Sequence, residues 1–167
     1  MNKSDIYNQA KVFLKKILAN AAESSLNLKN FPIDHLCYRT DSLECYEKSK
    51  KFFSTIGHLL IEGPISGRPI ATYKLLEPIH FENYSVDVVE VPAPKVGKET
   101  PEGFEHIELV IDTSFDHFIE EHPHLTFDRK GLSKEHNKEL AIKLEAGVIK
   151  LHHMTLEDVI KHEKANL

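Results

Sequence analysis

A short acid–histidine pattern occurs twice in this chain, and it constrains the fold more than any other feature. The first copy is FPIDHLCYR at residues 31–39, and the second is EGFEHIELVI at residues 102–111. In each copy an acid precedes a histidine, His35 or His106, inside a β-type run that leads through a polar cluster into a helical segment. The pattern therefore predicts two copies of one structural unit, with the two histidines at equivalent positions.

The signals around the two copies predict the same order of elements twice: strand, helix, strand, strand, strand. Residues 31–91 form the first βαβββ unit and residues 102–153 the second, and the Pro-rich segment 92–101 links them. The predicted fold class is α+β, with the two units forming a curved mixed sheet around a cleft. We expect a turn at Ser66 and Gly67 within the first unit, and a loop at 130–138 within the second.

Amphipathic helices flank the two units and are expected to lie outside the sheet. Apolar residues recur at three- and four-residue spacing over residues 4–22, and Ser4 is a candidate N-cap. A C-terminal helix at 155–165 begins at Thr155, which has an acid three residues later. With 167 residues, the whole chain 1–167 is expected to form a single domain.

The composition limits which binding partners and which cellular compartment are expected. The net charge of −5 argues against nucleic acid or an anionic membrane as the main partner. No apolar run is long enough to span a bilayer, and two cysteines are too few for a disulfide framework. We therefore expect a cytoplasmic protein, monomeric or homodimeric, that binds a small molecule.

Strand alternation predicts that each central strand has one apolar face and one face with ionisable groups. The ionisable face would carry His35, Cys37, Arg39, Arg68, Lys74, Glu90, His106, Glu108, Lys150 and His152. Glu105 would point away from it. An antiparallel sheet with one solvated face is the ordinary explanation of such a pattern. However, solvated faces usually carry Lys, Glu and Thr, whereas His, Glu and Arg at mid-strand favour convergence in a cleft.

Four of these residues form a chemically sensible metal site: His35, Glu90, His106 and His152. Neutral imidazole suits Zn, Fe, Ni and Mn, and a carboxylate adds negative charge. A single histidine is more often structural than a ligand, so this hypothesis depends on the equivalent positions of the two repeated histidines. Glu108, two residues from His106 on the same face, is a competing carboxylate ligand.

Other ionisable residues suggest catalytic and binding roles. Glu108 or His136 could act as the acid or base that moves a proton. A carboxylate or phosphate of the substrate could be held by Arg39, Arg68, Lys74 and Lys150, since Arg presents a bidentate fork to such groups. This set of cations predicts a small anionic partner.

Five segments in the same order resemble the YecM family. They are DHLCYR at 34–39, GRPI at 67–70 with Lys74, VEVP at 89–92, GFEHIE at 103–108 and IKLH at 149–152. The resemblance implies the vicinal-oxygen-chelate fold of glyoxalase I, extradiol dioxygenases and bleomycin-resistance proteins. In that superfamily the metal ligands come from the first and last strands of each unit, and the last is commonly Glu, so His152 departs from the pattern.

The leading hypothesis is a metal-dependent enzyme of lyase, isomerase or dioxygenase type. Its substrate would be a small anionic metabolite chelated through neighbouring oxygens. The alternative is a non-catalytic protein of the same fold that binds a small ligand in the same cleft. A structural dimerisation protein is a third possibility. The resemblance to the YecM family does not supply a reaction.

Overall fold

The computed structural model describes residues 1–65 and 67–165, so the turn expected at Ser66 lies outside the described residues. The first unit has the predicted order of elements: β1 (Ile33–Arg39), α2 (Leu43–Ile56), β2 (Gly57–Ile65), β3 (Arg68–Phe81) and β4 (Tyr84–Pro92). Helix α2 begins at the predicted polar cluster, because the Ser42 side chain accepts a hydrogen bond from the Cys45 N–H.

The second unit repeats this order with shorter elements: β5 (Gly103–Val110), α3 (Phe115–Glu121), β6 (Phe127–Asp128), β7 (Leu140–Leu144) and β8 (Gly147–His152). The Ser114 side chain caps α3, because it accepts a hydrogen bond from the His117 N–H. The expectation of a loop over 130–138 is wrong for its first part, which is the 3-10 helix η1 (Lys130–Ser133). The Asp128 carboxylate accepts from the Lys130 N–H and so supports this turn.

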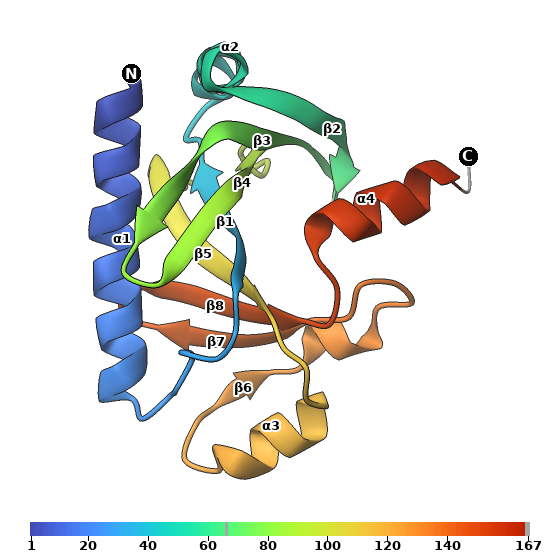
Figure 1. Cartoon of the computed structure of the whole chain (residues 1–167). Helices are drawn as coiled ribbons and strands as arrows, with labels where there is room; N and C mark the ends of the chain where they lie inside the picture. The colour runs from blue at the N-terminus through green and yellow to red at the C-terminus, as the bar shows by residue number, and fades with distance from the viewer. Residues whose placement is uncertain (66, 166–167) are drawn as a thin grey trace.

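Two helices flank the units, α1 (Lys3–Glu23) and α4 (Leu156–Ala165). Helix α1 begins before Ser4, since the Asn2 side chain accepts a hydrogen bond from the Asp5 N–H and acts as the N-cap. Thr155 caps α4 through the Asp158 N–H, as predicted. Figure 1 shows α1 along one side of the sheet and α4 on the other, beside β2. Among the described residues, no helix is both long and apolar enough to cross a membrane.

The two units share one curved, eight-stranded sheet with the order β2-β3-β4-β1-β5-β8-β7-β6. Strands β1 and β5, which carry the two acid–histidine patterns, are antiparallel neighbours at its centre. Within each unit the first strand pairs in parallel with the last, β1 with β4 and β5 with β8. The α+β fold class predicted from the sequence is confirmed.

The hydrophobic core lies on the face of the sheet that α1 covers. Leu36 of β1 and Ile107 of β5 are fully buried there, together with Leu14 and Ile17 of α1. Burial of side chains of this size stabilises the fold by about 1.5–3 kcal/mol each. The alternating residues His35 and His106 consequently point to the opposite face.

Candidate metal centre

The strand register produces two neighbouring rows of side chains across the centre of the sheet. The residues of each row are direct cross-strand partners, which share a face of the sheet. The first row is Thr72, Glu90, Cys37 and His106. The second row is Lys74, Val88, His35, Glu108 and Lys150. Ionisable groups that are far apart in the sequence are therefore neighbours where the two units meet.

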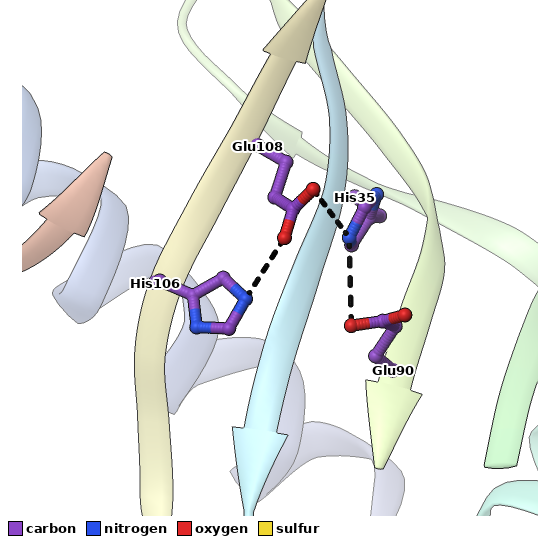
Figure 2. Close-up of side chains that lie close together, drawn as sticks. All are labelled: His35, Glu90, His106 and Glu108. Atoms are coloured by element: carbon purple, nitrogen blue, oxygen red, sulfur yellow. Dashed lines mark ion pairs between the residues drawn. The ribbon is translucent and has the colours of Figure 1, made fainter. Parts of the chain in front are cut away.

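Four side chains of these rows point toward one another (Figure 2). Ligand atoms of His35, Glu90, His106 and Glu108 all lie within 4.8 Å of one another. Nε2 of His35 is 3.5 Å from one oxygen of Glu108 and 3.7 Å from Glu90. Nε2 of His106 is 3.2 Å from the other oxygen of Glu108. Two imidazoles and two carboxylates at this spacing could hold a divalent cation.

Both of these imidazole nitrogens are left without a hydrogen bond. His35 and His106 are 2% and 5% exposed, and neither Nε2 atom has a hydrogen-bond partner among the described residues. A buried polar atom without a partner costs free energy, so native structures rarely contain one without a reason. A bound cation would satisfy both nitrogens at once.

The acid before each histidine fixes the orientation of the ring. Asp34 lies 2.7 Å from Nδ1 of His35, and Glu105 lies 2.5 Å from Nδ1 of His106. With Nδ1 engaged in this way, Nε2 of each ring faces the cluster. Carboxylates play this part behind metal-bound histidines, where they set the tautomer. Alternation placed Glu105 off the ionisable face, and its contact with its own neighbour could not be found from alternation alone.

The cluster perturbs the protonation of its members. Burial alone would lower the pKa of His35, but the charge of Glu108 and the hydrogen bond with Asp34 raise that pKa well above its usual value of 6.5. The pKa of His106 is raised in the same way, against burial, by Cys37, Glu105 and Glu108. Burial acts to raise the pKa of Glu108, yet the charges of His35 and Lys150 hold it well below its usual value. Without a cation, the imidazoles therefore hold protons.

His152 lies beside this cluster but is not in the set of four. Its Nε2 is 2.6 Å from one oxygen of Glu108, while Nζ of Lys150 is 2.8 Å from the other. Glu108 thus lies between the imidazoles of β1 and β5 and the side chains of Lys150 and His152 on β8. The structure brings His35, Glu90 and His106 together with Glu108, and it places His152 behind that carboxylate.

The predicted anion-binding residues have different surroundings. Arg39 pairs with Glu105 at 3.2 Å, and Arg68 donates to the backbone oxygen of Ala93 at 2.8 Å. Lys74 pairs with Asp87 at 2.9 Å and with Glu157 of α4 at 2.6 Å, so it connects β3 to the C-terminal helix. His136 is exposed in the segment between η1 and β7, and the described ligand cluster does not include it.

The sequence analysis did not single out Lys95, a cation whose pKa responds to the charges of Arg39 and Arg68. Burial first, and then the positive charges of Arg68, Lys98, Arg39 and Lys150, lower the pKa of Lys95. The positive charges of Arg68, Lys98, Arg39 and Lys150 thus act on Lys95. Lys95 is exposed in the Pro-rich linker, so strand alternation did not bring it into the predicted set.

These features define the class of protein. Two βαβββ units share one sheet, and the strands that begin and end the first unit contribute to a cluster with the first strand of the second unit. This is the vicinal-oxygen-chelate fold that the sequence resemblance implied. The YecM family model matches residues 2–163, so the chain belongs to the YecM family.

Curated relatives and a solved structure agree with this assignment. The chain is 35% identical over 100 residues to an uncharacterized protein of Haemophilus influenzae, covering 60% of this chain and 52% of that protein. It is 32% identical over 107 residues to Protein YecM of Escherichia coli, covering 64% and 57%. The matches thus span little more than half the length of either relative. A solved structure described as "Structural Genomics, Protein EC4020" superposes with a TM-score of 0.79 at 25% identity, covering 96% of this chain and 92% of that one.

Proposed function

We propose that this protein is a metal-dependent enzyme of the vicinal-oxygen-chelate type that acts on a small anionic molecule. The observation that carries the proposal is the pair of buried Nε2 atoms, on His35 and His106, that lack hydrogen-bond partners among the described residues and face two carboxylates. Acids behind both rings hold them in this orientation. Structural histidines buried in a core would instead use both ring nitrogens in hydrogen bonds.

The proposed ligands are His35, Glu90, His106 and Glu108. In this assignment Glu108 takes the place predicted for His152, since its carboxylate lies within reach of both imidazoles. Two imidazoles with carboxylates suit Zn, Fe, Ni or Mn. A bound ion would supply a Lewis acid able to engage two neighbouring oxygens of a substrate.

The residues around the ligands have complementary tasks. His152, 2.6 Å from Glu108, is the group best placed to hold or pass a proton at the edge of the cluster. With His35, Lys150 holds the pKa of Glu108 well below its usual value, because its positive charge lies 2.8 Å from that carboxylate. The cations Arg39, Arg68 and Lys95 would hold a carboxylate or phosphate of the substrate. Lyase, isomerase and dioxygenase reactions are all compatible with such an arrangement.

One observation favours the alternative, a protein that binds a small ligand without catalysis. The Glu108 carboxylate already has a positive partner, because Nζ of Lys150 lies 2.8 Å from it. A protonated cluster of this kind could bind an anion through its imidazolium groups. The two functions differ in whether metal is required.

Elemental analysis of protein purified without an affinity tag or added metal tests the proposal. We expect close to one equivalent of a transition metal, which His35→Ala and His106→Ala should both lose. His117→Ala is the matched control, since its side chain is exposed on α3. Full retention of metal in both cluster variants would overturn the proposed site. Anion binding by metal-free protein, with no metal uptake at all, would favour the non-catalytic alternative.

A further inference from the structure

Cys37 occupies the middle of the first row of side chains, between two of the proposed ligands. Its direct cross-strand partner on β4 is Glu90, and its direct partner on β5 is His106. All three side chains therefore project from the same face of the sheet. Cys37 is 1% exposed and is a free thiol. It is also two residues from His35, on the same face of β1.

The distances place this thiol beside His106, one member of the cluster. Ligand atoms of Cys37, Glu105 and His106 all lie within 4.8 Å of one another. His106 thus belongs both to this group and to the group of His35, Glu90 and Glu108. The Nε2 atom of His106, which lies 3.2 Å from Glu108, is buried and lacks a hydrogen-bond partner among the described residues, which points to a ligand-binding role at this position.

Neither a disulfide nor the packing of the core accounts for a buried thiol at position 37. Both described cysteines are free, and Cys45 lies on α2 near Ser49 rather than at the cluster. The hydrophobic core of the described residues is built on the other face of β1, from Leu36 and Tyr38. Packing of the core therefore does not require a sulfur atom at position 37.

We propose that Cys37 is a thiolate ligand of the ion bound by the cluster, an inference that rests on the proposed metal-dependent function. On binding, the thiol would release its proton to solvent, and the sulfur lone pair would form the bond to the ion. A thiolate is a soft ligand that favours Zn, Co or Fe, whereas a site of imidazoles and carboxylates alone also accepts harder ions such as Mn. The added sulfur would bias the centre toward softer ions.

Cobalt(II) is the probe, because its spectrum reports metal binding and sulfur ligation separately. Titration of metal-free protein with Co(II) should give visible d–d bands together with an intense near-ultraviolet sulfur-to-cobalt charge-transfer band. The d–d bands without a charge-transfer band would overturn ligation by Cys37 while leaving the metal site in place. No cobalt bands at all would contradict both Cys37 ligation and the proposed function. The wild-type spectrum is decisive even if a variant fails to fold.

Two single substitutions identify which cysteine supplies the sulfur ligand. In Cys37→Ser the charge-transfer band should disappear, and Zn(II) affinity should fall by about 100-fold or more, at least the loss that removal of an outer-shell partner causes. Mn(II) affinity should fall much less. Cys45→Ser should retain both the band and the affinity, since this half-buried cysteine lies outside the cluster. A band that persists in Cys37→Ser and vanishes in Cys45→Ser would disprove the assignment.

Discussion

The carboxylate of Asp34 lies 2.7 Å from Nδ1 of His35, and the same oxygen accepts a hydrogen bond from the Leu156 N–H at the start of α4. Glu105 holds His106 in the equivalent manner in the second unit. The acid–histidine pair that repeats in the sequence is thus a repeated orienting device. In the first unit the same acid also connects the cluster to the C-terminal helix.

Removing the charge of either acid should weaken metal binding without removing a ligand. We expect Asp34→Asn and Glu105→Gln each to lower Zn(II) affinity by about 10–100-fold, as is usual for residues behind a metal-bound histidine. Isothermal titration calorimetry on metal-free protein measures the change. Asp112→Asn, at an exposed position, is the control. Unchanged affinity in both variants would show that the acids do not set the ring orientation.

Metal affinity should rise with pH over the range above 6.5. The pKa values of His35 and His106 are raised in the metal-free fold because carboxylates surround them despite burial, so metal must displace protons there. The apparent affinity should therefore increase by up to about tenfold per pH unit for each displaced proton and level off above the raised pKa values. Calorimetry in buffers of different ionisation enthalpy counts the protons released. A flat profile between pH 6.5 and 8 would contradict this protonation state.

The stability of the metal-free protein should change with pH in the opposite direction. A histidine whose pKa is higher in the folded than in the unfolded state stabilises the fold fully below the unfolded value of about 6.5. That contribution is lost as the pH rises through the folded value. Urea denaturation of metal-free protein should thus show lower stability at pH 9 than at pH 6, and His35→Gln should reduce this difference. Stability that instead rises over this range would refute the interpretation.

Sequence patterns were enough to predict the order of elements, and alternation placed His35, His106 and Glu108 on one face, but alternation was wrong to place Glu105 away from them. It could not choose between Glu108 and His152, because both lie on that face and the choice depends on register. Only the pairing of His35 with Glu108 across β1 and β5 brings this carboxylate between the imidazoles. The ion pair between Lys74 and Glu157 could not be predicted either. It depends on how α4 packs against the sheet, and no local sequence pattern shows that packing.

The start of β8 depends on a glycine. Gly147 has φ of +152°, and a Cβ there would lie 2.4 Å from the backbone oxygen of Glu105. Gly147→Ala should therefore destabilise the protein by about 1–3 kcal/mol, the usual range for a residue in a disfavoured conformation. It should also weaken metal binding, because Glu105 orients His106. Gly63→Ala, with nothing within 4 Å of the added carbon, is the control in urea denaturation. Equal stability of the two variants would contradict the close approach of β8 and β5.

Lys95 should contribute to anion binding although the sequence assigns it to a linker. Neighbouring positive charges, after burial, lower its pKa, and a bound anion would relieve this repulsion. We expect Lys95→Met to weaken binding of inorganic phosphate by about 5–30-fold, the effect of losing one partly solvated charge-assisted hydrogen bond. Lys51→Met, at an exposed position on α2, should have no effect.

Phosphate binding measured at low and high salt separates a specific contact from general electrostatic attraction, since only the latter is largely screened. Equal phosphate affinity of Lys95→Met and wild type at both salt concentrations would exclude Lys95 from the anion site.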